Sequence, residues 1–138
     1  MTAPAVYPLI TVTALEASRD FLVQHFELRI VFEADWVVMF SDGRSEAIVL
    51  GLMRPEHPSA PPGPEPFGGL GMILTVQVED AAAACARMTA AGAPIRYPLT
   101  DEPWGQRRFM TVDPSGIRID VVEQIEPAPG FWDPPAGR

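Results

Sequence analysis

The sequence has little cysteine, little positive charge and no long hydrophobic run. The single Cys85 excludes a disulfide within the chain, and no Cys/His group has the spacing of a zinc site. The formal net charge of −8 argues against nucleic acid and anionic membrane surfaces as partners. No apolar stretch approaches the roughly 20 residues that cross a membrane, and the N-terminus lacks a signal-peptide pattern. Together these absences predict a cytoplasmic protein with neither nucleic-acid nor membrane partners.

Hydrophobic residues make up 47% of the 138 positions, enough for the core of one domain or of two small modules. In the first half, apolar residues alternate in short strand-like runs and recur at steps of three and four in one helical run. The turn Ser41–Arg44 contains Asp-Gly, which favours a hairpin between the last two strands. The expected elements are a strand at 6–12, a helix at 14–26 and strands at 29–34, 36–41 and 46–52.

The second half repeats this order. A strand at 72–78 and an alanine-rich helix at 79–91 precede a short strand at 94–97 and a hairpin, 107–112 and 117–122, whose turn is Asp-Pro-Ser-Gly. Neither half could bury both faces alone, so the halves should close around a shared concavity. The sequence predicts an α+β fold divided into a first module (6–52), a Pro/Gly-rich linker (53–71), a second module (72–124) and a Pro-rich tail (125–138).

The final strand of the second half carries unusual polarity. Period-two geometry places Arg118, Asp120 and Val122 on one face, which is expected to line the concavity. An exposed outer face is the alternative interpretation. The turn before the hairpin, Pro103–Gln106, presents Trp104, and the Phe131-Trp132 pair predicts that the tail docks through an aromatic anchor.

The doubled order, with V-E-D-A at the second helix and PWGQRRF…DPSGIRID near the end, resembles the vicinal oxygen chelate superfamily over about residues 6–124. That superfamily includes glyoxalase I, bleomycin-resistance proteins and extradiol dioxygenases. The resemblance implies two βαβββ modules that form a cupped mixed sheet around a cavity, commonly in a homodimer. By position, the family's two metal-binding histidines fall on Tyr7 and Ile73, and its last-strand carboxylate falls on Asp120. Since isoleucine cannot ligate, the resemblance implies a member with no metal or other cofactor.

The resulting hypothesis is a metal-free cavity that holds a planar or cationic small molecule, as in the drug-sequestering branch of that superfamily. Arg118 is expected to neutralise part of the charge of Asp120. One alternative is an enzyme, either a metal-dependent lyase, isomerase or dioxygenase or a metal-free catalyst with Asp120 and Tyr7 as proton-transfer groups. Another is a structural or regulatory dimer. The candidate ligand-binding residues are Tyr7, Thr11, Trp36, Thr75, Gln77, Trp104, Arg118 and Asp120.

Overall fold

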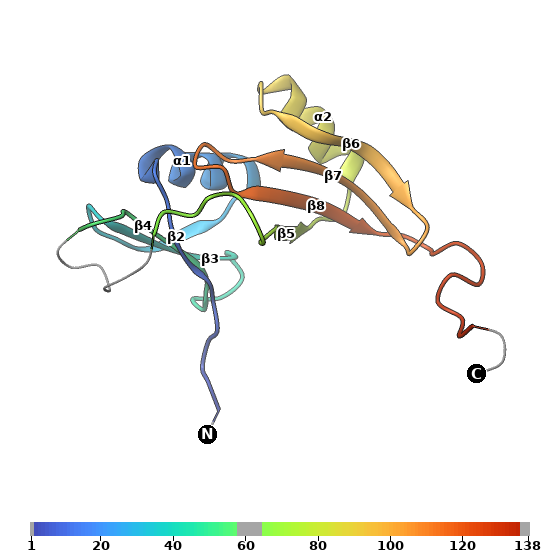
Figure 1. The fold of residues 1–138 in the computed structure, drawn as a ribbon, viewed down its shortest axis with the longest axis horizontal. Coiled ribbons are helices and arrows are strands. Elements are labelled where there is room, and N and C mark those ends of the chain that lie inside the picture. Colours follow the sequence, from blue (N-terminus) through green and yellow to red (C-terminus); the bar gives the residue numbers. More distant parts are fainter. Residues whose placement is uncertain (1, 58–64, 136–138) are drawn as a thin grey trace. The chain divides into compact units, whose positions relative to one another are not determined.

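The computed structural model describes residues 2–57 and 65–135, which form two compact units (Figure 1). The first unit holds the described residues up to Met72 together with the turn Asp113–Ile117. The second holds Ile73–Val112 together with the described residues from Arg118 onward. Each unit holds one helix and one four-stranded mixed sheet. The α+β class and the doubled β-α-β-β-β order predicted from the sequence are therefore confirmed.

In the first unit, the sheet has the strand order β1-β4-β3-β2, with β1 parallel to β4 and the other pairs antiparallel. Leu50 and Leu52 on one face of β4 lie opposite Phe40 and Val38 on β3, and all four are buried. Leu15 and Leu22 are the large apolar residues that the helix adds to this core. The elements are β1 (Leu9–Thr11), α1 (Leu15–Phe26), β2 (Arg29–Glu33), β3 (Val37–Ser41) and β4 (Ile48–Met53).

In the second unit, the sheet order is β5-β8-β7-β6, with β5 parallel to β8. One face carries Phe109, Ile119 and Val121, which are fully buried under the α2 residues Ala84 and Met88. Figure 1 shows α2 lying along this sheet. We call the opposite face, which carries Asp120, the open face. The elements are β5 (Leu74–Gln77), α2 (Ala81–Ala90), β6 (Ile95–Glu102), β7 (Gln106–Val112) and β8 (Arg118–Gln124).

The strand β6 corrects the sequence prediction, which ended it at Tyr97. It continues through Pro98 as far as Glu102. Proline lacks the N–H that a central strand needs, but β6 is an edge strand, and its register to β7 shifts between Tyr97 and Thr100. The extension brings Glu102 into the sheet, opposite Gln106.

The tail beyond β8 docks on the β6–β7 turn, as its aromatic pair predicts. The Ile125 amide donates to the Gly105 carbonyl (2.9 Å), and the Ala128 amide donates to the Pro103 carbonyl (2.8 Å). The Trp132 indole donates to the Trp104 carbonyl (2.8 Å), although the Trp132 ring remains largely exposed. The tail therefore braces the turn that carries Trp104.

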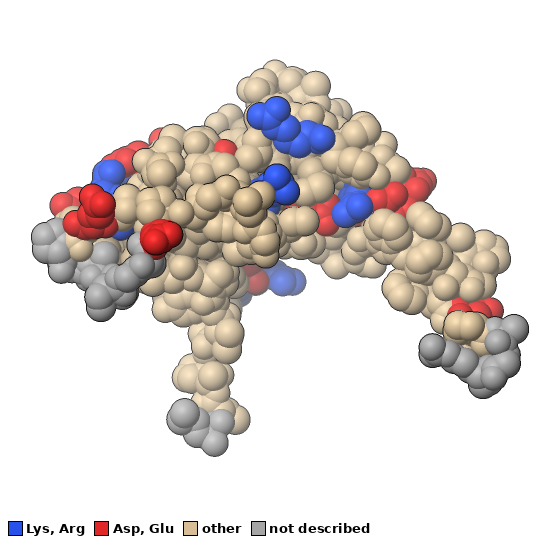
Figure 2. All heavy atoms as spheres, viewed as in Figure 1, with Lys and Arg blue, Asp and Glu red and all other residues tan. Residues whose placement is uncertain are grey.

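Two surface properties bear on possible partners. Within the part of the chain that the structure describes, no helix is long and apolar enough to cross a membrane. On the face shown in Figure 2, basic and acidic residues are scattered over a mostly uncharged surface, without an extended basic patch among the coloured residues.

The β7–β8 turn is built around the buried side chain of Asp113. Its Oδ1 accepts hydrogen bonds from the amides of Ser115 (3.0 Å) and Ile117 (2.7 Å). The Ser115 hydroxyl accepts from the Ala14 amide (3.1 Å) and lies 2.6 Å from the Ser18 hydroxyl. These contacts tie the turn to the start of α1 within the first unit.

We expect Asp113→Ala to lower the free energy of unfolding by about 2–3 kcal/mol, because two amides lose a charged acceptor in a buried turn. Chemical denaturation measures this loss. The matched control is Asp42→Ala, which removes a similar aspartate from the exposed turn of the first unit, where it accepts from the Arg44 amide. The control should cost much less. Equal losses for the two variants would show that burial of the Asp113 turn contributes nothing.

Candidate functional site

The open face of the second unit brings together side chains from all four strands. Thr75 on β5 lies opposite Asp120 on β8, which in turn lies opposite Met110 on β7. Met110 pairs with Tyr97 on β6. Arg118 lies opposite Val112, so the predicted sharing of one face by Arg118 and Asp120 is confirmed by the register.

Arg108 is the centre of a cluster on this face. Its Nε donates to Glu102 Oε2 (2.8 Å), and its Nη1 lies 3.5 Å from Asp120 Oδ2. The guanidinium carbon lies 5.1 Å from the ring centroid of Tyr97 and 5.1 Å from that of Trp104, so it has a cation–π contact with each. The Tyr97 hydroxyl donates to the same Glu102 oxygen (3.1 Å). We refer to these five residues as the Arg108 cluster.

Burial governs the electrostatics of the cluster. The Asp120 side chain is only 10% exposed, and this desolvation raises the pKa of its carboxyl group although the nearby Arg108 opposes the rise. Burial acts to lower the pKa of Arg108, but the hydrogen bond to Glu102 and the charge of Asp120 outweigh it and raise the pKa. Asp120 Oδ1 is buried and has no hydrogen-bond partner among residues 2–57 and 65–135. The negative charge of Asp120 is therefore offset by the guanidinium of Arg108, and not by that of Arg118 as the sequence analysis expected.

A pocket of about 490 Å³ lies beside the cluster and shares Tyr97 with it. β7 contributes its last three residues, β6 and β8 contribute others, and Ile73 directly precedes β5. Three apolar side chains and the tyrosine ring face a small number of polar groups, a composition typical of small-molecule sites. The lining residues are Ile73, Arg96, Tyr97, Met110, Thr111, Val112 and Arg118.

The other candidates of the second unit lie around this pocket rather than in it. Trp104 sits in the β6–β7 turn, where its indole donates to Gln106 Oε1 (2.9 Å) and its ring lies 6.4 Å from that of Phe131. Gln77 on β5 accepts a hydrogen bond from Gln124 (3.2 Å). Trp104 therefore supports the Arg108 cluster, and part of its ring is already covered by the chain itself.

Three candidates belong to the first unit. Tyr7 precedes β1 and is 36% exposed, whereas Thr11 on β1 is buried. Within the described part of the chain, the Thr11 hydroxyl has no hydrogen-bond partner. Trp36 lies just before β3 and stacks nearly parallel on His57, with ring centroids 5.5 Å apart. A ligand that stacks on Trp36 would compete with His57 for that ring face.

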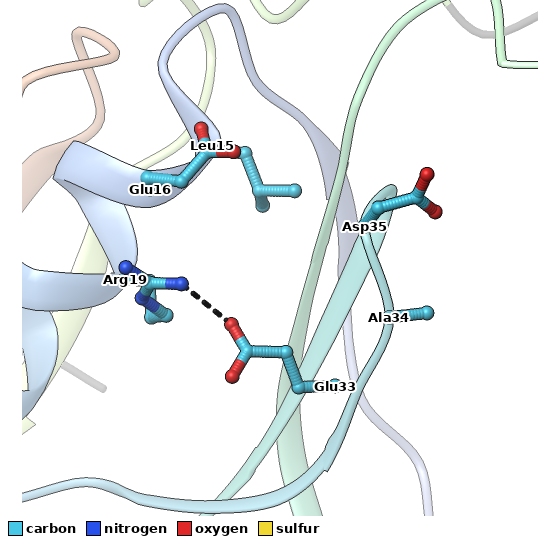
Figure 3. Close-up of a pocket in the computed structure, with 6 residues that line it drawn as sticks. All are labelled: Leu15, Glu16, Arg19, Glu33, Ala34 and Asp35. Carbon is cyan, nitrogen blue, oxygen red and sulfur yellow. Dashed lines mark hydrogen bonds and ion pairs between the residues drawn. The ribbon is translucent and has the colours of Figure 1, made fainter.

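The first unit has a pocket of its own, of about 340 Å³, between the start of α1 and the end of β2 (Figure 3). Its charges are largely balanced within the chain. Arg19 bonds Glu33 at 2.7 Å, as drawn in Figure 3, and Glu16 is paired with Arg54. The remaining lining residues are Leu15, Ala34 and Asp35. This internal pairing makes the pocket a weaker candidate than the open face of the second unit.

The residues at the metal-ligand positions of the vicinal oxygen chelate enzymes, Tyr7, Ile73 and Asp120, do not fit a divalent metal site. Ile73 has no donor atom, and the charged group closest to Asp120 is the cation of Arg108, which competes with a metal ion for the carboxylate. No group of three His, Cys, Asp or Glu side chains that could hold a metal ion occurs among the residues described.

Comparison with known proteins agrees with this architecture. The sequence model of the Glyoxalase/Bleomycin resistance protein/Dioxygenase superfamily matches residues 5–121, so the chain belongs to that superfamily. A member from Sphaerobacter thermophilus DSM 20745 is 25% identical, with a TM-score of 0.71 over 90% of this chain and 99% of that one. No curated protein matches the sequence.

Two further solved structures share the fold. TnmS3, an antibiotic binding protein from Streptomyces sp. CB03234, is 21% identical, with a TM-score of 0.68 over 89% of this chain and 97% of that one. A lactoylglutathione lyase from Agrobacterium tumefaciens is 20% identical, with a TM-score of 0.66 over 89% of this chain and 96% of that one. One fold thus carries both a binding protein and an enzyme, so function must be argued from the site.

We expect Arg108→Gln to lower the free energy of unfolding by about 2 kcal/mol, because the largely buried carboxylates of Glu102 and Asp120 lose their counter-ion. Solvent that reaches the partly exposed site screens some of this loss. The neighbouring Arg107 points to the opposite face and pairs with the exposed Asp101. Arg107→Gln is therefore the control and should leave the stability nearly unchanged. Chemical denaturation that ranked the two variants the other way round would contradict the central role of Arg108.

The raised pKa of Asp120 predicts a pH dependence of stability. The pKa of Asp120 is higher in the folded protein than in the unfolded chain. The contribution of this group to the stability of the fold is therefore lost as the pH rises from the unfolded pKa through the folded one. The free energy of unfolding of the wild type, minus that of Asp120→Asn, should therefore fall between about pH 4 and neutrality. A difference that rises with pH would mean that Arg108 outweighs burial at this carboxyl group.

Proposed function

We propose that this protein binds a planar small organic molecule, without a metal, at the open face of the second unit. The observation that carries the proposal is the pocket of about 490 Å³, which is bordered by the Tyr97 ring and lies beside the Arg108 cluster. Ile73, Met110 and Val112 offer apolar contact, and Tyr97 offers a ring face or edge. The antibiotic-binding TnmS3, which has the same fold, supports this class of function.

The residues predicted from the sequence take different parts in this proposal. Arg118 lines the pocket, and Thr75 and Gln77 flank Asp120 and Val122 on β5. Asp120 and Trp104 act on the pocket through the Arg108 cluster rather than by lining it. Contacts from Tyr7, Thr11 and Trp36, the homodimer and the cytoplasmic location all stay predictions.

A second candidate function is metal-free proton transfer by Asp120. Two observations favour it: burial raises the pKa of Asp120, and its buried Oδ1 has no hydrogen-bond partner within the described chain. An acid–base group works best when its pKa approaches the ambient pH. Turnover that is lost in Asp120→Asn, while ligand affinity is retained, would distinguish catalysis from simple binding.

The proposal is tested with 2-naphthamide, a neutral planar probe, titrated into the isotope-labelled protein and followed by NMR. Chemical-shift changes should be concentrated at Tyr97, Met110 and Val112. Tyr97→Leu, which keeps an apolar side chain but removes the ring, should weaken binding by about tenfold, on the scale of base–aromatic stacking. Trp104→Ala should also weaken it, through the loss of support for Arg108.

The matched control is Phe32→Ala, which removes an aromatic ring that is 57% exposed on β2 of the first unit. It should leave the affinity for 2-naphthamide unchanged. Shift changes confined to the first unit, or an affinity that ignores Tyr97→Leu, would place the site elsewhere.

A further inference from the structure

The arginines in the described part of the chain differ in whether their side chains are paired with other groups. The sequence has ten arginines and no lysine against 18 acidic residues, so carboxylate partners are plentiful. Arg87 has an interaction partner, and Arg108 is paired with Glu102 in the Arg108 cluster. In contrast, neither the Arg96 nor the Arg118 side chain makes an ion pair or hydrogen bond with any described residue. The arginines paired with carboxylates are Arg19, Arg29, Arg44, Arg54, Arg107 and Arg108.

Arg96 and Arg118, whose side chains have no carboxylate partner among the described residues, line the same pocket. Arg118 lies on β8 opposite Val112. Arg96 lies on β6, which pairs with the other edge of β7, at the point where the pairing register shifts between Ile95 and Tyr97. The pocket thus has a guanidinium on each flank of β7 and apolar residues between them.

The charges around the pocket favour an anion. Among the residues described, its lining includes no Asp or Glu. The nearby Asp120 does not compensate, because Arg108 already contacts it at 3.5 Å. A cationic ligand would therefore meet two like charges, whereas a carboxylate would neutralise them. Guanidinium groups match the two oxygens of a carboxylate with paired hydrogen bonds.

We infer that this pocket selects an organic acid: a planar apolar body with a carboxylate held between Arg96 and Arg118. The body lies against Ile73, Met110 and the Tyr97 ring. The inference rests on the proposed binding function and specifies the charge of the ligand, opposite to the cation considered from the sequence.

Three probes with the same ring system separate charge from shape: 2-naphthoate, 2-naphthamide and 2-naphthylmethylamine, which are anionic, neutral and cationic at neutral pH. Affinities are measured by NMR titration at one moderate salt concentration. We expect 2-naphthoate to bind at least about tenfold more tightly than the amide, because a charge-assisted hydrogen bond is worth more than a neutral one. The amine should bind most weakly.

Arg96→Gln and Arg118→Gln should each weaken 2-naphthoate binding by about tenfold and weaken 2-naphthamide binding clearly less, because the neutral amide forms no charge-assisted hydrogen bond. Both arginines are exposed, so these variants should fold normally. The control is Arg29→Gln, which removes an exposed, Glu46-paired arginine of the first unit and changes the net charge equally. It should not change the affinity for 2-naphthoate.

Each other outcome overturns the inference. If the amide binds at the pocket and the acid binds no better, the binding function stands and the selection for an acid is wrong. A preference for the acid that is lost equally in Arg29→Gln would reflect overall charge rather than a site. If none of the three probes binds to the second unit, both the inference and the proposed function fail.

Discussion

The open face of the second unit depends on the placement of one guanidinium group. Glu102 and Asp120 would be costly to bury alone, and Arg108 offsets both of them while the rings of Tyr97 and Trp104 cover it. Guanidinium is weakly hydrated and stacks well on aromatic rings, so arginine suits this position better than lysine would. The tail contributes by holding the β6–β7 turn that carries Trp104.

This arrangement separates two kinds of positive charge. Arg108 is paired with Glu102 and Asp120. It also lies over the rings of Tyr97 and Trp104, which could otherwise attract a cationic ligand. Arg96 and Arg118 have no such partner within the described chain, and both face the adjoining pocket. An acidic protein can therefore present a locally basic site, because the local pairing of charges decides what a pocket attracts more than the net charge does.

Much of the fold could be predicted from the sequence, because Pro, Gly and Asp mark the turns and the apolar periodicity separates helices from strands. The shared face of Arg118 and Asp120 followed from period two alone. Arg108, Glu102 and Tyr97 were missed for a physical reason: β6 continues through Pro98 with shifts of register, and pairing across strands cannot be read from local pattern. One signal was present, since counting by twos along the strand places Arg108 on the same face as Met110 and Val112.

Acid binding at this pocket is tested most directly by locating a bound acid in solution. Intermolecular nuclear Overhauser effects would be recorded between the ring protons of 2-naphthoate and the methyl groups of the protein. We predict contacts to the methyl groups of Ile73, Met110 and Val112. Contacts instead to Leu9 and Met39, which flank Gly51 in the first unit, would contradict it.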